Sequence, residues 1–479
     1  MRWFVVLLLL VCSRFAGAQT PSQPEPQPAP QSASQPSTPA SRPAPPQPQH
    51  SPQADYDETM RPLDITRRSI ENWSDAERAA LAVGVQQASK SCESRSPGQF
   101  RGEDLIAYVR LCYLGEQWDL VRQAAMNYRR EQSAATAEEK KSGFPSLATA
   151  FDYEVQASLR LGDFVDAVDT SETMLRTVAY DDLTSDATSA AIRAVQLQRT
   201  SQAMAVLNQR QPILLSLLRG YALPDPATAT GAHPPLSLNA LYADAIVLPT
   251  LLQLANQPKD AAASFAELEA ALPSSLPPDD AILIGESRRQ YQLLGSPLPA
   301  IATYADLLKP SSVSTRDLDK KPDSATVLLL FPEWCAQCVG MGKQFVPAAA
   351  RLNQKGARFY ALLAQDHRPP PTLKPALRPA TARGPKSASA NAAKSQLDQE
   401  RIHVPTTAEL LAGTPTLVVP NQTLDTFVAR DFPLIVVADR NGIVRSIQVA
   451  PEKALVPDGF IDQIVDRVLE QWPLPTKSK

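Results

Sequence analysis

The chain has 479 residues, with 47 lysines and arginines against 50 aspartates and glutamates, a formal net charge of −3. At roughly 150 residues per domain, this length predicts two or three domains, and the nearly balanced charge argues against a general nucleic-acid binder. The 45 prolines are about twice the usual share, so part of the chain should be extended. Five cysteines are too few for a disulfide scaffold of this size.

Residues 1–18 are typical of a secretory signal peptide, with Arg2 before an apolar run and small residues at 16–18. An uncleaved membrane anchor is the alternative, but the run from Trp3 to Cys12 is far shorter than the ~20 residues that span a bilayer. We therefore expect an exported protein, periplasmic or extracellular, with no membrane span in the mature chain. Residues 19–60, rich in Pro, Gln, Ser and Ala, should form a disordered linker, because they offer too little apolar surface to offset chain entropy.

Residues 61–310 contain apolar residues at helical spacing and few glycines, which predicts an all-α region. Its segments partly repeat: LGEQWDLV at 114–121 matches LGDFVDAV at 161–168, and a third copy begins at Leu294 and would end a helix at Pro310. The match is specific at 161–168 and 294–310 and loose elsewhere. These turns resemble those of tetratricopeptide repeats, although the spacing does not keep that family's ~34-residue period.

The repeat resemblance implies a role for each residue of the second turn. Gly162 would take the tight turn, Phe164 would wedge between helices, and Ala167 would leave room for the partner helix. The family implies that a concave face binds partner proteins. The alternative is a helical domain that merely supports its neighbour.

Cys92 and Cys112 lie in two consecutive predicted helices, on either side of a turn. In an oxidising compartment we expect them to form a structural disulfide, worth about 3 kcal/mol for a loop of about 20 residues. The alternative is a pair of buried free thiols.

The segment 325–331 (ATVLLLF) predicts a buried strand, and the helix predicted over 339–352 follows it closely. Between them lies a Cys-x-x-Cys motif, Cys335-Ala-Gln-Cys338. At the start of a helix, unpaired N–H groups favour a thiolate, so Cys335 should be the attacking thiol and Cys338 the resolving thiol.

The motif FPEWCAQC at 331–338 resembles the active-site signature of the thioredoxin superfamily, and the resemblance extends over roughly residues 314–472. It implies strands near 358–363, 416–419 and 434–438, a hairpin at Asn441-Gly442 and a closing helix over 460–469. It also implies that Trp334 shapes the site and that Pro433 is the cis-proline beside the cysteines. The ordering is most similar to exported bacterial thiol–disulfide oxidoreductases.

Three residues depart from that family's pattern. Leu329 takes the place of a buried aspartate, Pro347 lies later than the usual helix proline, and the bulky Phe432 precedes the cis-proline position. The absent carboxylate removes one route for deprotonating the resolving cysteine. Between Asp366 and Asp398 the chain also carries six lysines and arginines and no acidic residue, which predicts a disordered basic insertion over about 367–397.

Two alternatives compete with a redox function. A zinc site would have to combine the two cysteines with His367 and His403, which lack paired spacing, so we expect no metal. A structural disulfide in a redox-inactive fold is the stronger alternative. We expect no cofactor, since the sequence has no phosphate-cradling or metalloprotease motif.

The sequence thus predicts a multidomain chain: an all-α helical-hairpin repeat domain followed by an α/β thioredoxin-like domain over 311–479. The predicted function is dithiol–disulfide exchange on protein thiols or disulfides, with the helical repeats recruiting partner proteins. The alternative function is a non-catalytic binding scaffold.

Overall fold

The computed structural model describes residues 51–69, 74–136, 146–221, 236–301, 324–365, 416–451 and 453–473. The expected signal peptide, the linker up to residue 50 and the basic insertion lie outside these ranges, as does the expected domain boundary near residue 310. Residues 52–60, which we expected in the linker, belong to helix α1 (Pro52–Ser69) instead. The reason is that Thr59 and Leu63 give this helix a buried face, which packs on the next two helices.

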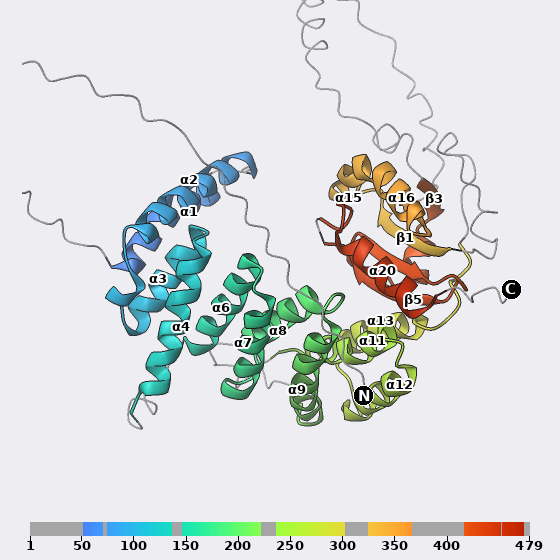
Figure 1. Cartoon of the computed structure of the whole chain (residues 1–479), viewed down its shortest axis with the longest axis horizontal. Coiled ribbons are helices and arrows are strands. Elements are labelled where there is room, and N and C mark those ends of the chain that lie inside the picture. Colours follow the sequence, from blue (N-terminus) through green and yellow to red (C-terminus); the bar gives the residue numbers. More distant parts are fainter. Residues whose placement is uncertain are drawn as a thin grey trace, which may run out of the picture. The chain divides into compact units, whose positions relative to one another are not determined.

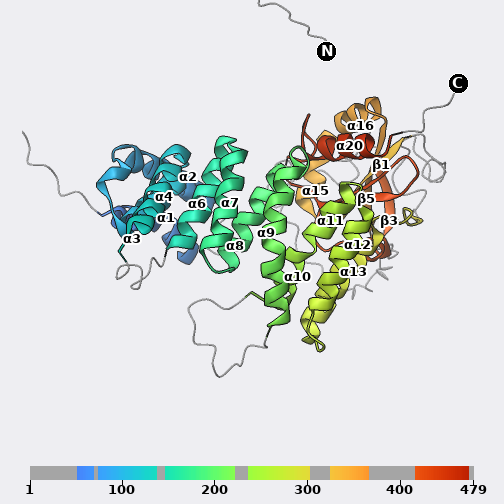
Figure 2. The same cartoon turned by 60° about the horizontal axis from the view of Figure 1, so that its bottom comes forward.

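Up to Leu293, the described chain is helical (Figures 1 and 2). Described helices that follow one another in the chain contact each other from α1 to α12, and α6 also contacts α3 and α8. After α1 come α2 (Ser74–Glu93), the 3-10 turn η1 (Pro97–Gln99), α3 (Gly102–Leu114), α4 (Trp118–Ala134), α6 (Leu147–Leu161), α7 (Phe164–Thr177), α8 (Asp182–Val195), α9 (Thr200–Arg219), α10 (Leu238–Ala245), α11 (Val247–Leu254), α12 (Pro258–Ala271) and α13 (Pro278–Leu293).

Three of the inter-helix turns have the same backbone form. In each, one residue takes the left-handed conformation: Glu116 at φ 56°, Gly162 at φ 76° and Asn256 at φ 58°. The next residue donates its N–H back to a carbonyl in the preceding helix, at 2.9, 2.8 and 2.9 Å respectively. This is the Schellman pattern, which satisfies the last carbonyls of a helix. Gly162 therefore takes the tight turn, as expected.

When the first two turns are compared by backbone conformation, their equivalent residues are shifted by one position from the sequence match. Glu116, not Gly115, is the structural counterpart of Gly162, and Trp118 is the counterpart of Phe164 because each begins the next helix. Gly115 serves a different purpose: a Cβ built on it would lie 2.5 Å from the backbone N of Ser89. A glycine is needed there because α2 crosses closely, and the backbone torsion plays no part.

The third match, which begins at Leu294, is not an inter-helix turn. After α13 the chain is extended, with Pro297 forming an antiparallel bridge to Ile443. The helix expected to end at Pro310 lies outside the described residues from residue 302 on. Pro297 and Pro299 disfavour a helix over 297–301 because they lack the N–H that a helix needs.

The second region is built on a mixed five-stranded sheet with the order β3-β2-β1-β4-β5. The central strand β1 pairs parallel with β2 and antiparallel with β4, while β3 and β5 form the edges. The strands are β1 (Ala325–Pro332), β2 (Ala357–Gln365), β3 (Thr416–Pro420), β4 (Leu434–Ala438) and β5 (Val444–Val449), and the helices are α15 (Ala336–Gly340), α16 (Phe345–Gln354), α19 (Gln422–Thr426) and α20 (Phe460–Gln471), with a 3-10 turn η2 (Met341–Gln344).

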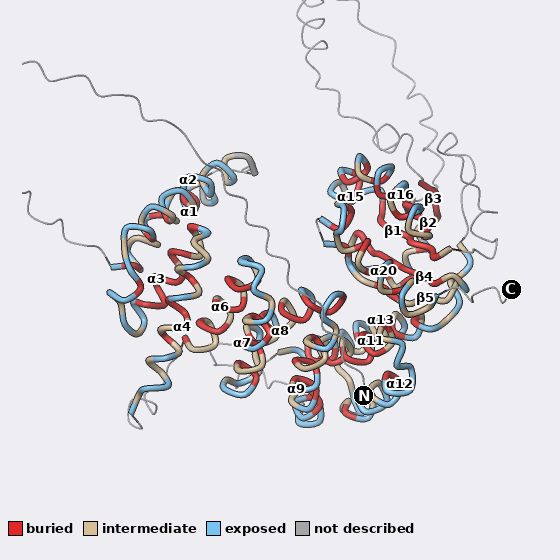
Figure 3. Tube along the Cα trace, viewed as in Figure 1, coloured by how far each residue is buried: buried red, intermediate tan, exposed pale blue. Residues whose placement is uncertain are grey.

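Every residue of β1 is buried, which explains why the strand is apolar at every position except Thr326 (Figure 3). Leu329 and its odd-numbered neighbours face one core with α16 and α20, and this core is continuous with residues of α8, α9 and α11. Leu328 and Leu330 face the other core, which includes Tyr291 and Leu294 from the end of the helical region. The helical region therefore contributes to both sides of the sheet.

The helix predicted over 339–352 is broken into α15, η2 and α16. Pro347 lies in the first turn of α16, where a helix tolerates a missing N–H. In a continuous helix, the same proline would leave the carbonyl of Lys343 without a partner. Glycines 340 and 342 further weaken helix formation in the interval.

Candidate functional site: a cysteine pair at the end of the central strand

Cys335 and Cys338 lie where β1 ends and α15 begins, and their sulfur atoms are joined in a disulfide with the two Cα atoms 5.3 Å apart. Cys335 caps α15, and its Sγ accepts a hydrogen bond of 3.3 Å from the N–H of Cys338. The same N–H can stabilise a thiolate on Cys335 after reduction. The helical segment behind the motif is short, so this stabilisation comes from nearby N–H groups and less from a long helix dipole.

The two cysteines differ in exposure. Cys335 is partly exposed, whereas Cys338 is 0% exposed and packs in the apolar core beneath the sheet. An attacking substrate can therefore reach one sulfur and not the other. The same core contains Leu329, which stands where the thioredoxin resemblance would put an aspartate.

Trp334 is the most exposed large apolar side chain among the described residues, at 75%. Its ring meets that of Phe432 edge to face, with centroids 5.5 Å apart. Pro433 follows, and its peptide bond to Phe432 is cis. Since Leu330 of β1 faces Leu434 of β4, the strand register puts Phe432 and Pro433 beside the end of β1. The structure thus places Trp334 directly before Cys335 and Pro433 near the end of β1, from which the cysteine motif follows.

The second cysteine pair lies far along the chain from the first. Cys92 and Cys112 are joined at an S–S distance of 1.98 Å, and both are 0% exposed. They link α2 to α3 inside a core with Tyr108, whose hydroxyl donates to the Cys92 carbonyl at 3.0 Å. Burial raises the pKa of Tyr108 to about 12, so the hydroxyl stays protonated and keeps this bond. Complete burial keeps both sulfurs out of contact with solvent.

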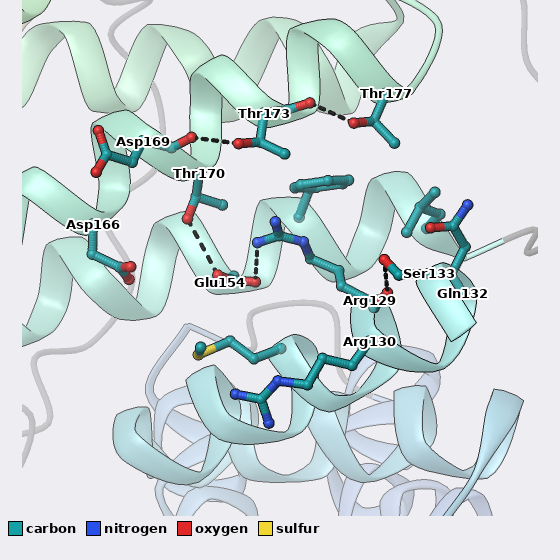
Figure 4. A pocket seen from close by; sticks show the side chains of 13 residues that line it. Arg129, Arg130, Gln132, Ser133, Glu154, Asp166, Asp169, Thr170, Thr173 and Thr177 are labelled. Atoms are coloured by element: carbon teal, nitrogen blue, oxygen red, sulfur yellow. Dashed lines mark hydrogen bonds and ion pairs between the residues drawn. The ribbon is translucent and has the colours of Figure 1, made fainter. Parts of the chain in front are cut away.

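The helical region has a cleft of about 370 Å³ between α4, α6 and α7 (Figure 4). Arg129 reaches into it, lies over the Phe151 ring at 4.1 Å and pairs with Glu154 at 2.7 Å. Burial raises the pKa of Glu154, although the Arg129 charge opposes this shift. Thr170 donates a hydrogen bond of 3.2 Å to the same carboxylate. The cleft therefore presents both charges and several hydroxyl groups.

Some functional features were missed by sequence reasoning. The ring contact between Trp334 and Phe432 joins a residue that follows β1 to one that precedes β4, and no local pattern indicates it. His367 and His403, the two histidines of the zinc alternative, lie outside the described residues. Within the described ranges, no group of three or more His, Cys, Asp or Glu side chains is placed to hold a metal ion. In the same ranges, no helix has both the length and the apolar character to cross a bilayer.

The C-terminal part of the chain therefore consists of a mixed sheet in which a Cys-x-x-Cys pair follows the central strand. No protein-family model matches the chain, and neither does any curated protein. Among solved structures, the C-terminal part is similar to a thiol:disulfide interchange protein from Bacteroides sp., at 14% identity over 36% of this chain and 90% of that one, with a TM-score of 0.22.

Two further structures have similar scores. A putative thiol:disulfide interchange protein DsbE from Chlorobium tepidum is 20% identical over 36% of this chain and 99% of that one, with a TM-score of 0.20. A DsbF homologue from Corynebacterium diphtheriae is 17% identical over 36% and 87%, with a TM-score of 0.21. TM-scores near 0.2 carry no functional argument, so the functional proposal depends on the geometry of the cysteine pair.

Proposed function

We propose that this chain catalyses dithiol–disulfide exchange on protein thiols or disulfides through Cys335 and Cys338. The observation that carries the proposal is the unequal exposure of the two sulfurs at one strand-to-helix junction. Cys335 is partly exposed and accepts an N–H bond, whereas Cys338 is fully buried. Exchange enzymes need this asymmetry, because one thiol must meet the substrate while the other waits to resolve the intermediate.

The reaction proceeds in two steps. The Cys335 thiolate attacks one sulfur of a substrate disulfide, forms a mixed disulfide, and expels the other substrate sulfur as a thiolate that takes up a proton. The Cys338 thiolate then attacks Cys335 Sγ, which closes the 335–338 disulfide and releases the second substrate thiol. The substrate gains two electrons and two protons, and the chain loses them. In the reverse direction, the same steps transfer the 335–338 disulfide to a pair of substrate thiols.

The surroundings of the pair suit a protein substrate. Trp334 is exposed at 75% and offers an apolar platform beside the motif. Phe432 supports its ring from the side, and Pro433 follows at the start of β4. We assign Trp334 and Pro433 the shaping of this surface, and Cys335 and Cys338 the chemistry.

The helical region is proposed to recruit partner proteins. Its inter-helix turns at Glu116, Gly162 and Asn256 share one backbone form, in keeping with a degenerate tetratricopeptide-like array. The cleft beside Arg129 and Glu154 offers paired charges that an extended polypeptide can meet with its own polar groups (Figure 4). An exported location, periplasmic or extracellular, fits the signal-like residues 1–18 and the buried Cys92–Cys112 link.

A second function, a non-catalytic scaffold, is favoured by one observation. Leu329, fully buried in the same core as Cys338, supplies no carboxylate that could act as a base for the resolving thiol. In this case the cysteine pair would be a structural disulfide and the helical region would carry the function.

A redox titration of the 335–338 pair separates the two functions. A reversible couple between about −100 and −270 mV, the range of known catalysts, supports exchange. A pair that resists reduction far below that range supports the scaffold. In parallel, Cys335→Ser should abolish turnover of a peptide disulfide, and Cys338→Ser should accumulate the mixed disulfide. The Cys92→Ala/Cys112→Ala double variant controls for loss of the other disulfide, and unchanged turnover in Cys335→Ser refutes catalysis.

A further inference from the structure

An ion pair ties the helical region to the loop that carries Phe432 and Pro433. Glu286 lies in the middle of α13, and its carboxylate Oε1 accepts a hydrogen bond from Nη2 of Arg430. Arg430 belongs to the segment 427–433, which connects α19 to β4 and ends at the cis-proline. It lies two residues before Phe432, whose ring contacts Trp334. The pair therefore reaches one wall of the cysteine site.

Glu286 is deeply buried for a carboxylate, at 5% exposed. A buried charge is strongly destabilising unless a group of opposite charge stays beside it. Arg289 is a second cation near Glu286, but it lies 4.0 Å from the same oxygen and belongs to the same helix. Of these two arginines, only Arg430 joins α13 to the loop. The need to compensate the buried carboxylate therefore holds the loop against the helix.

The loop and α13 also share an apolar core. Phe427 is fully buried, and it belongs to the core on the face of the sheet that contains Tyr291 of α13. Ala429, at 9% exposed, belongs to the same core. Phe432 is partly buried against it. The helical region therefore contacts this loop through apolar packing as well as through the ion pair.

The backbone of the loop is strained at one residue. Val428 has φ 52°, in the left-handed region, which is strongly disfavoured for a β-branched side chain. The N–H of Ala429 donates a hydrogen bond of 2.8 Å to the carbonyl of Leu424, which closes the turn around it. A strained segment keeps one conformation only when its surroundings hold it there. The bond between Arg430 and Glu286 is one such constraint.

We propose that Glu286 is a positioning residue for the cysteine site. Through Arg430, it holds the loop in the conformation in which the Phe432 ring supports Trp334 edge to face. The surface beside the cysteine motif is then preorganised for a substrate polypeptide, so less binding free energy is spent on ordering it. The consequence for substrate binding rests on the proposed exchange function, whereas the effect on Trp334 does not.

The first test is fluorine NMR of the full oxidised chain labelled with fluorotryptophan. Trp334→Phe assigns the Trp334 resonance, and Phe432→Ala gives the shift that follows loss of the ring contact. Glu286→Gln and Arg430→Gln should each move the resonance in that same direction. The double variant should move it no further, because both residues act through one pair. Asp279→Asn, which removes an exposed carboxylate from the same helix, is the matched control and should leave the resonance unchanged.

The second test is single-turnover oxidation of the reduced chain by a peptide disulfide with a phenylalanine beside one cysteine. Glu286→Gln should raise the half-saturating peptide concentration about fivefold and leave the maximum rate within about twofold, because the loop contributes to binding and not to the chemistry. The rate with hydroxyethyl disulfide, which has no side chain to meet Trp334, should be the same in Glu286→Gln as in the parent.

An unmoved Trp334 resonance in both Glu286→Gln and Arg430→Gln would overturn the proposal, as would an equal shift in Asp279→Asn. An unchanged half-saturating concentration would overturn the link to substrate binding. If the parent chain does not react with the peptide at all, the proposed exchange function fails, and the resonance still decides whether Glu286 positions Trp334. If Glu286→Gln does not fold, Arg430→Gln removes the same pair from a side chain that is 66% exposed.

Discussion

The N–H of Gly295 donates a hydrogen bond of 2.8 Å to the carbonyl of Val444, and the N–H of Val444 donates in turn to Ser296 at 2.9 Å. With Leu298 bound to Gly442 at 2.7 Å, the segment after α13 covers part of the edge of β5. Covering this edge matters because an open strand edge exposes unpaired backbone groups. It also means that the helical and sheet regions share main-chain bonds as well as core side chains.

Because the helical and sheet regions share these contacts, we expect a substitution in α13 to destabilise the sheet. Tyr291 stacks on Phe265 with ring centroids 4.2 Å apart and belongs to the core on one face of the sheet. Tyr291→Ala should lower the free energy of unfolding by about 3 kcal/mol and speed amide hydrogen exchange in β4 and β5. Ile282→Ala, on the same helix but 58% exposed, is the matched control. Equal exchange rates in both variants would show that the sheet is independent of α13.

The exposure difference between the two cysteines predicts selective modification. After reduction, Cys335 should react with iodoacetamide at least tenfold faster than Cys338, because only the first sulfur is reachable. Mass spectrometry of the modified peptides over a pH series measures both rates. Cys92 and Cys112, each 0% exposed, serve as internal controls that should react only on unfolding. Comparable rates at 335 and 338 would remove the basis for assigning distinct roles.

Two glycines in equivalent-looking turns should respond differently to substitution. Gly115→Ala places a Cβ 2.5 Å from the Ser89 backbone, so we expect a loss of about 3 kcal/mol in unfolding free energy. Gly162→Ala meets open space but keeps φ 76°, so the loss should be about 1 kcal/mol. Asn tolerates the left-handed conformation, so Gly162→Asn should lose less than Gly162→Ala, while Gly115→Asn should be at least as harmful as Gly115→Ala. Urea unfolding followed by circular dichroism measures all four, and the same order at both positions would contradict this distinction.

A partly buried carboxyl on α6 predicts a pH effect on stability. Burial raises the pKa of Asp152 from 3.8 to about 6, and the Asp186 charge acts in the same direction. The native state therefore holds this proton more tightly than the unfolded chain, so the free energy of unfolding decreases as pH rises from about 4 through about 6. Asp152→Asn should raise stability at pH 7 by about 1–2 kcal/mol, and the difference should vanish below about pH 4.

The control for this prediction is Asp169→Asn, which removes an exposed carboxylate from α7. Thermal unfolding midpoints of both variants and the parent, taken between pH 4 and pH 7, provide the measurement. If Asp152→Asn raised stability equally at pH 4 and pH 7, the effect could not come from ionisation of Asp152.

Much of the local structure could be predicted from short segments. The apolar run at 325–331 predicted β1, because a strand buried on both faces needs apolar side chains throughout. The motif at 335–338 was placed at a strand-to-helix junction, where the structure has it. The prediction of one continuous helix over 339–352 is wrong, because Pro347 would leave the carbonyl of Lys343 without a partner in such a helix.

What the amino-acid sequence determined by itself was the buried strand at 325–331 and the Cys335–Cys338 motif that follows it, because these depend on sterics and side-chain patterns within a few residues. Only the tertiary structure decided that Gly115 must make room for Ser89, that the segment after α13 covers β5, and that Glu286 pairs with Arg430. Each of these joins residues from different elements, and their contact depends on how helices and strands pack, which no local pattern encodes.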